Sequence, residues 1–306
     1  MPKSSSALQP VTRSPTLRVC LGSFTQPWTF GPYARQLVIL ATELAKKHAV
    51  LWLALGYQDT NVKIKVPNLP EQVGFVGGGF PRNTGIYVSD INSVLRQHEM
   101  DVLITLCDLN RLFVDEMWSP LSIAWFPNHF VHLDTHSRHA LTAYDAVAVL
   151  GPSDATRVQE QLPHKHVVHV PHVIEDPGKL GKASRAKLRE KYGVPADKFV
   201  ALVNFANYDG ERNRKSIDLS LMAWRDFHQG HRDSLLYLHA VALPTDGVHL
   251  PGLLAMTEVL PDSYMLDTRE LKYEESLELS RMADVLLQPS KTEGTPRNTE
   301  ARARRT

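Results

Sequence analysis

The sequence predicts an α/β protein built from parallel sheets with helices on both faces, organised as two domains. Short continuous apolar runs of strand type alternate with segments of helical periodicity along most of the chain. Continuous apolar runs are typical of parallel strands that are buried on both faces. The chain has 306 residues, more than one hydrophobic core comfortably organises, so two domains are expected.

The first domain is expected over residues 17–174, after a Ser- and Pro-rich stretch, residues 1–16, that we expect to be a disordered tail. Its predicted strands are residues 17–21, 50–55, 73–76, 102–106, 121–126, 146–150 and 167–170. A helix is predicted to start at Gly31-Pro32, and others over residues 90–97 and from near Asp134. The amino end of a helix offers free N–H groups to an anion or a polar substrate.

A linker or helix is expected over residues 175–190, then a second domain over 191–296 and an irregular tail over 297–306. The predicted strands of this domain are residues 199–205, 235–238, 264–266 and a buried-type strand at 285–287. Its predicted helices are 253–259, 274–282 and one that carries Ile217, Leu221, Trp224 and Phe227 on one face. The same order of strand, loop and helix therefore repeats in both domains.

Composition excludes several classes of protein. The formal net charge of +1 gives no concentrated basic footprint, so no nucleic-acid partner is expected. No run of about 18 apolar residues is present, so no transmembrane segment is expected. The first sixteen residues lack the apolar stretch of a secretory signal, which predicts a cytoplasmic protein.

A polar loop between the strand 199–205 and the following helix carries the cations Arg212, Arg214 and Lys215. A guanidinium presents a planar fork that matches phosphate oxygens, a lysine adds a mobile point charge, and the amino end of the helix adds a favourable field. A diphosphate would be well held by this combination. The alternative is a charged loop that only faces solvent.

The strand 285–287 ends near Pro289 and leads into a loop that carries Glu293 and Gly294. Ligands of open α/β sheets bind beyond the carboxyl ends of the strands. A carboxylate beside a glycine can accept hydrogen bonds from sugar or ribose hydroxyls while the backbone approaches closely. The alternative is an exposed glutamate in a turn.

Taken together, these segments resemble the retaining, nucleotide-sugar-dependent glycosyltransferases of the GT-B fold (glycosyl transferase group 1, or family 4-like). The resemblance covers about residues 17–296. It is carried by residues 199–239, 273–285, 289–290 and 293–294 in the second domain, and by 31–32, 125–129, 144–147 and 170–172 in the first. It implies two Rossmann-like domains, with the donor bound by the second.

The resemblance also implies transfer of a sugar from a nucleoside-diphosphate sugar to an acceptor, with retention and with no further cofactor. Arg214 and Lys215, with Arg212 as a third candidate, would bind the donor diphosphate, and Glu293 would contact the donor sugar. Gly31 and Gly294 would belong to the substrate loops. The sequence does not identify the acceptor, which could be a saccharide, a lipid or a protein.

Histidines at positions 129, 132, 136 and 139, with Asp134 among them, have spacings that could share one helical face. No matched cluster of ligands accompanies them, and the GT-B family generally needs no bound metal, so no metal site is expected. Because they follow a strand end, His129 is a candidate catalytic residue and His132 a candidate substrate contact. The alternative is ordinary surface or core histidines.

The resemblance ends soon after Gly294. The family continues with a Gly-aromatic-Gly-x-Pro pattern and a second glutamate eight positions after the first, whereas here Thr295-Pro296 follows and position 301 is alanine. We therefore expect the second domain to be incomplete and the chain to be a truncated member. Two alternatives remain: an inactive remnant with at most nucleotide-sugar or protein binding, and a sugar-nucleotide epimerase of the same fold.

Overall fold

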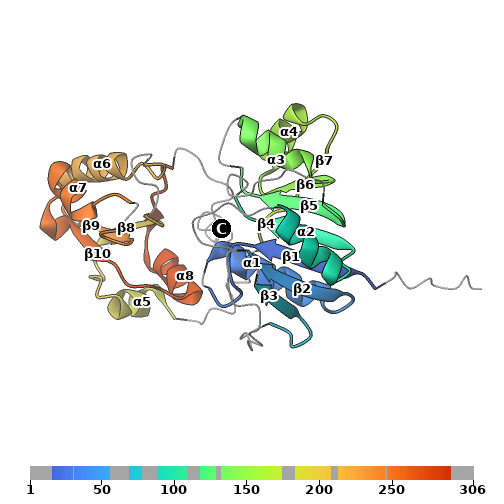
Figure 1. The fold of residues 1–306 in the computed structure, drawn as a ribbon. Coiled ribbons are helices and arrows are strands. Elements are labelled where there is room, and N and C mark those ends of the chain that lie inside the picture. The colour runs from blue at the N-terminus through green and yellow to red at the C-terminus, as the bar shows by residue number, and fades with distance from the viewer. Residues whose placement is uncertain are drawn as a thin grey trace, which may run out of the picture. The chain divides into compact units, whose positions relative to one another are not determined.

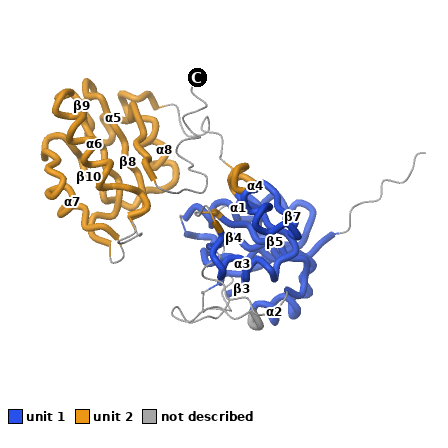
Figure 2. Tube along the Cα trace, turned by 90° about the horizontal axis from the view of Figure 1, so that it is seen from above, with its two compact units in different colours: residues 1–126, 133–149, 155–169 blue, residues 127–132, 150–154, 170–306 orange. Residues whose placement is uncertain are grey.

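The computed structural model describes residues 16–29, 31–55, 69–77, 88–108, 118–128, 132–173, 183–207, 213–244 and 247–290. The chain divides into two compact units (Figure 2). Unit 1 comprises residues 1–126, 133–149 and 155–169, and unit 2 comprises residues 127–132, 150–154 and 170–306. Each unit contains a parallel sheet of its own (Figure 1).

The sheet of unit 1 has the order β3-β2-β1-β4-β5-β6-β7. Its strands are β1 (Arg18–Ser23), β2 (Ala49–Ala54), β3 (Gly74–Gly77), β4 (Val102–Leu106), β5 (Leu121–Phe126), β6 (Ala146–Val149) and β7 (His166–His169). The helices between them are α1 (Pro32–Leu44), α2 (Val88–Gln97), α3 (Thr135–Thr142) and α4 (Pro152–Gln161). All pairs are parallel, and the strand order reverses between β1 and β4.

Unit 1 buries apolar side chains on both faces of this sheet. One face packs Cys20 and Leu103 against Leu95 of α2 and Leu141 of α3 in a single cluster. Successive side chains of a strand point to opposite faces, so Leu21 turns away from Cys20. On that side α1 packs on β1 and β2 and buries its own apolar residues. The strands therefore read as continuous apolar runs because neither face is open to water.

The sheet of unit 2 has the order β10-β9-β8-β11 among the described residues. Its strands are β8 (Phe199–Asn204), β9 (Ser234–His239), β10 (Tyr264–Asp267) and β11 (Val285–Leu286). Its helices are α5 (Arg185–Lys191), α6 (Ile217–Gly230), α7 (Leu250–Met256), the short 3-10 helix η4 (Pro261–Ser263) and α8 (Tyr273–Met282). All three strand pairs are parallel.

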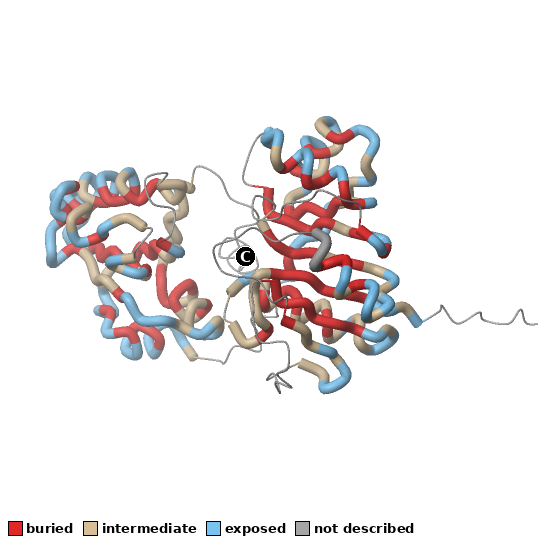
Figure 3. The backbone as a smooth tube through the Cα atoms, in the orientation of Figure 1, coloured by how far each residue is buried: buried red, intermediate tan, exposed pale blue. Residues whose placement is uncertain are grey.

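Two separate cores cover the two faces of this smaller sheet. Ala201 and Val203 of β8 pack with the apolar sides of α6 and α7, whereas Val200 and Leu202 pack with α5 and α8. Figure 3 shows the buried residues concentrated along the strands and on the inner sides of the helices of each unit. The predicted architecture of parallel sheets with helices on both faces is thus confirmed.

The structure differs in three details from what the sequence patterns suggest. The helix expected over 253–259 is α7, which begins earlier because the His249 side chain accepts from Gly252 N–H and Pro251 occupies the first turn. Phe227 is 39% exposed rather than buried. The strand 285–287, expected to be of buried type, is only half-buried, because β11 pairs with β8 alone among the described strands.

An ion pair fixes the start of β11. Arg189 of α5, with 8% of its side chain exposed, lies 2.6 Å from the Asp284 carboxylate. Arg189 also donates to the carbonyl oxygens of Met282, Ala196 and Lys198, and the same Asp284 oxygen accepts from the N–H of Val200. The buried guanidinium therefore joins α5, β8 and β11, the strand that precedes Glu293 in the sequence.

Candidate functional site

The strand order of unit 2 reverses between β8 and β11, and this topological switch point is where open α/β sheets bind ligands. The N–H of Leu287 donates to the carbonyl oxygen of Leu202 over 2.8 Å. The loop after β8 and the loop after β11 therefore leave the sheet at the same edge. The first carries Arg214 and Lys215; Glu293, Gly294 and Arg212 lie outside the described residues.

Arg214 and Lys215 lie in a tight turn at the amino end of α6. The residues on either side of them, Asn213 and Ser216, have left-handed backbones, with φ of 40° and 51°. Asn213 closes the turn, because its carbonyl accepts from Ser216 N–H and its side-chain oxygen accepts from Ile217 N–H over 3.1 Å. The two cations are half-buried in a position set by the turn.

A second asparagine, Asn207, links the segments that lie beside this turn. The amide of buried Asn207 donates to the carbonyl oxygens of Val241 and Val248 and accepts from Val248 N–H, each over 2.8 Å. The backbone at Gly247 lies so close to Asn207 that a Cβ on Gly247 would be 2.2 Å from the Asn207 carbonyl oxygen. Asn207, Val248, Arg214 and Lys215 line a hollow of only 10 Å³, room for about one water.

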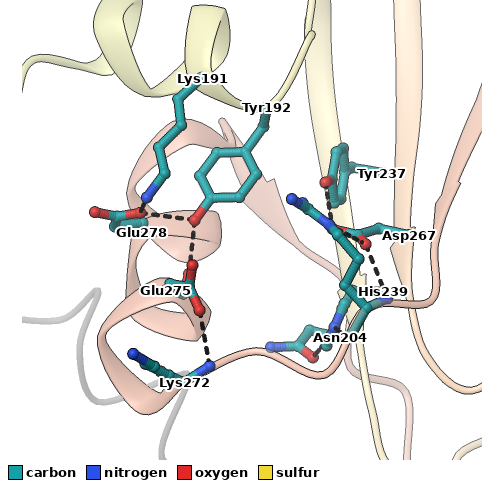
Figure 4. Close-up of polar contacts among 10 residues, drawn as sticks. Lys191, Tyr192, Asn204, Tyr237, His239, Asp267, Lys272, Glu275 and Glu278 are labelled. Carbon is teal, nitrogen blue, oxygen red and sulfur yellow. Dashed lines mark hydrogen bonds and ion pairs between the residues drawn. The ribbon is translucent and has the colours of Figure 1, made fainter.

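The carboxyl ends of β8 and β9 are linked by His239 and Asn204 (Figure 4). The ring nitrogens of His239 lie 2.8 Å from Asn204 Oδ1 and 2.9 Å from the carbonyl oxygen of Arg269, and Asn204 donates to Ser276 on α8. Two oxygens facing one ring require either an imidazolium or an Asn204 amide turned by 180°. In both cases the loop after β10 and the start of α8 are tied to this edge.

Asp267 ends β10 and anchors Arg269 at the same edge. Arg269 donates to both carboxylate oxygens, over 2.8 and 2.6 Å, and Tyr237 donates over 2.7 Å. Burial disfavours the ionised carboxyl, but the hydrogen bonds from Arg269 and Tyr237 prevail and hold the pKa of Asp267 well below its usual range. Burial and the Asp267 hydrogen bond raise the pKa of Tyr237. Asp267 is therefore ionised at neutral pH and orients an exposed guanidinium.

Unit 1 has a comparable edge between β1 and β4, its own switch point. The Ser23 hydroxyl donates to the Leu106 carbonyl oxygen over 2.8 Å, and Tyr33 of α1 donates to Asp108 over 2.9 Å. Gly31 is the N-cap of α1, and, apart from its neighbours in the chain, no heavy atom of the described residues lies within 4 Å of the position that a Cβ would occupy there. The edge thus combines a helix amino end with a fixed hydroxyl and carboxylate.

The histidine segment has a structural explanation where it is described. Asp134 caps α3 by accepting from Ser137 N–H over 2.6 Å, and this hydrogen bond lowers the pKa of Asp134. His132 is exposed, and His129 lies outside the described residues. In the part of the chain that the structure describes, no group of three or more His, Cys, Asp or Glu could hold a metal ion.

Sequence reasoning missed Asn204, His239, Asp267 and Arg269. Each stands at the last position of a strand or two residues beyond it. A polar residue directly after an apolar run of strand type was the available signal, but their partners lie on other strands, which the sequence does not pair.

None of the described helices is long and apolar enough to span a membrane. No protein-family model and no curated protein matches the sequence. Solved structures do resemble this one. The N-terminal domain of Candida albicans trehalose-6-phosphate phosphatase matches with a TM-score of 0.67 at 10% identity, covering 98% of this chain and 82% of that chain.

Two further structures are similar. Anabaena HepE, solved in complex with UDP and glucose, matches with a TM-score of 0.62 at 15% identity, covering 92% of this chain and 76% of that chain. A glycosyltransferase from Rickettsia africae matches with a TM-score of 0.60 at 12% identity, covering 90% of this chain and 73% of that chain. The chain therefore has the GT-B fold of two Rossmann-like units, as the sequence predicts.

Proposed function

We propose that the chain binds a nucleoside-diphosphate sugar at the carboxyl edge of the unit 2 sheet and transfers its sugar to an acceptor with retention. The observation that supports this proposal is the parallel pairing of β8 with β11, because the segments that follow the two strands then leave the sheet at one edge. The fold is that of glycosyltransferases, and one structural neighbour was solved with UDP and glucose.

Arg214 and Lys215 are the proposed diphosphate contacts, with Arg212 as a third. As the bond between the anomeric carbon and the diphosphate oxygen breaks, negative charge grows on the leaving group, and fixed cations stabilise it without a metal. The acceptor hydroxyl oxygen forms the new bond, and its proton passes to the departing diphosphate. The turn held by Asn213 means that little reorganisation is needed when this charge develops.

Glu293 and Gly294 are proposed to contact the donor sugar, and Gly31, His129 and His132 to face the acceptor side of the reaction. No cofactor beyond the donor is proposed. The acceptor class stays open among saccharides, lipids and proteins. These roles rest on the positions of the residues after strand ends and on the fold.

The test is a reaction assay with radiolabelled UDP-, GDP- and ADP-sugars and a panel of saccharide, lipid and peptide acceptors. Hydrolysis, transfer and epimerised donor are scored separately, and the anomeric configuration of the product is read by NMR. The proposal predicts a transfer product that keeps the donor configuration and is lost in Lys215→Ala. Binding without turnover points to the inactive remnant, and an epimerised donor to the epimerase.

A further inference from the structure

A groove of 430 Å³ lies at the amino edge of the unit 2 sheet, at the opposite ends of the strands from the basic turn. It runs between the last turns of α6 and the segment that leads into β10. Its polar lining comes from Arg225, His228, Gln229, Arg232, Glu258 and Ser263. The volume is within the range of small-molecule sites, roughly 300–1,000 Å³.

The walls of the groove are fixed by hydrogen bonds within the unit. The indole N–H of Trp224, which is 2% exposed, donates to the Ser263 carbonyl oxygen over 3.2 Å. The Ser263 hydroxyl donates to the Leu260 carbonyl oxygen over 2.7 Å. Arg225 is held by its neighbour Asp226 over 2.8 Å. The floor of the groove is therefore fixed, whereas Arg232 and Glu258 lie on its exposed rim.

His228, which is buried, is one of the residues that line the groove, and the hydrogen bond of its Nδ1 sets its tautomer. The Ser234 hydroxyl donates to the His231 carbonyl oxygen, so it can only accept from His228 Nδ1, 3.0 Å away. Burial first, and then the charges of Arg232 and Lys198, lower the pKa of His228, and Asp262 opposes them only in part. The ring is neutral at neutral pH with its proton on Nδ1, which leaves Nε2 as a hydrogen-bond acceptor.

Glu258 lies on the opposite side of the groove with a strained backbone. It follows the last residues of α7 with a φ of 56°, a conformation that glycine adopts at little cost and glutamate does not. This left-handed residue ends α7, since the N–H of Val259 then donates to the carbonyl oxygen of Leu254 over 3.2 Å. The Glu258 carboxylate supplies a second acceptor.

The lining holds two guanidinium groups, Arg225 and Arg232, and one carboxylate, Glu258, so it offers donors to an anionic group and an acceptor to hydroxyls. Arg225 is balanced by Asp226, whereas the guanidinium of Arg232 has no carboxylate partner among the described residues. We propose that this groove binds a small oxyanion that carries hydroxyl groups, a hydroxycarboxylate or a phosphate monoester. Its anionic group faces Arg232 and Arg225, and its hydroxyls donate to His228 Nε2 and Glu258.

This site is separate from the proposed donor site. Lys215 precedes α6 and Arg232 follows it, and the helix has 14 residues. At 1.5 Å per residue the two ends are about 20 Å apart, so no small ligand reaches both. The proposal therefore does not depend on nucleotide binding.

Calorimetric titration of the full chain with glycerate, glycerol 1-phosphate and glycerol tests it. We expect at least one anion to bind and neutral glycerol not to bind, and comparison of the two anions decides between carboxylate and phosphate. Arg232→Gln should weaken binding about tenfold, since a charge-assisted hydrogen bond is lost. Lys187→Gln, which removes an exposed charge on α5, should leave the affinity unchanged.

Glu258→Gly keeps the proposal testable if Arg232→Gln unfolds. It relieves the left-handed backbone, so the melting temperature should hold or rise while the anion affinity falls. Absence of binding by both anions, equal weakening by Lys187→Gln, or displacement of the anion by saturating UDP would each overturn the proposal.

Discussion

Leu287 donates its backbone N–H to the carbonyl oxygen of Leu202, and this 2.8 Å bond fixes the end of β11 beside β8. The two strands are parallel neighbours, so the chain must leave both of them at the same edge of the sheet. Arg214 and Lys215 follow β8, and Glu293 follows β11. This relationship turns two separate sequence signals into one candidate site, and the account depends on β11 staying in place.

The buried ion pair of Arg189 should therefore matter far more than its exposed neighbour. Arg185 and Arg189 contact the same Asp284 carboxylate, but their side chains are 48% and 8% exposed. Arg189→Ala should lower the free energy of unfolding by about 3–5 kcal/mol, because it leaves a half-buried carboxylate without its main partner. Arg185→Ala should cost about 0–1 kcal/mol. Urea denaturation of both variants measures the difference, and equal costs would contradict the assignment.

Gly247 should tolerate no side chain. A Cβ there would lie 2.2 Å from the Asn207 carbonyl oxygen and 2.2 Å from the Pro244 ring, and neither atom can easily move. Gly247→Ala should destabilise unit 2 by about 1–3 kcal/mol through overpacking. Gly230→Ala is the matched control, since a Cβ at the end of α6 meets nothing, and it should stabilise the helix by roughly 0.5–1 kcal/mol. In thermal melts the melting temperature should fall for Gly247→Ala and rise for Gly230→Ala. An unchanged melting temperature in Gly247→Ala would disprove the close contact.

The Asp267 carboxylate should give a pH-dependent contribution to stability. Its pKa is depressed in the folded state, so its stabilisation is complete above the unfolded value, about 3.9, and is lost as pH falls below it. Asp267→Asn should cost about 1–3 kcal/mol at pH 7, because Tyr237 and Arg269 lose a charged acceptor.

The cost of Asp267→Asn should shrink as the pH is lowered below about 4. Melting temperatures of both proteins across pH 3–7 test this prediction. Glu43→Gln, which removes an exposed ion pair with Lys46, serves as the control and should change little at any pH. A cost that is constant with pH would show that Asp267 stabilises through shape and not through charge.

The strands were predictable because both faces of each sheet are covered, which produces continuous apolar runs. The α4 helix was missed although Gly151-Pro152 repeats the signature that identified α1 at Gly31-Pro32. Phe227 shows the limit of periodicity, because an aromatic ring at a helical spacing can instead stack on His231, 4.1 Å away at the helix end. The half-burial of β11 depends on strand neighbours, which a single segment does not reveal.

The residues of the candidate site also include some that the sequence suggests and some that it does not. Arg214 and Lys215 could be proposed from the sequence because charge density and position before a helix are local properties. Asn204 and His239 were not, since their roles come from hydrogen bonds to each other and to the loop after β10. Asn213 and Ser216 were also hidden, because a left-handed backbone at a residue other than glycine has no reliable sequence signature.

The most direct test of the central claim is a calorimetric titration with UDP, GDP, ADP and CDP. It compares the full chain with the double variant Arg214→Ala/Lys215→Ala and with Lys187→Ala, which removes a distant exposed charge. We predict that at least one diphosphate binds and that the double variant weakens it by about a hundredfold, since two charge-assisted contacts are lost. Lys187→Ala should bind as the unchanged chain does. Binding that survives in the double variant, or folded protein that binds none of the four, would contradict the account.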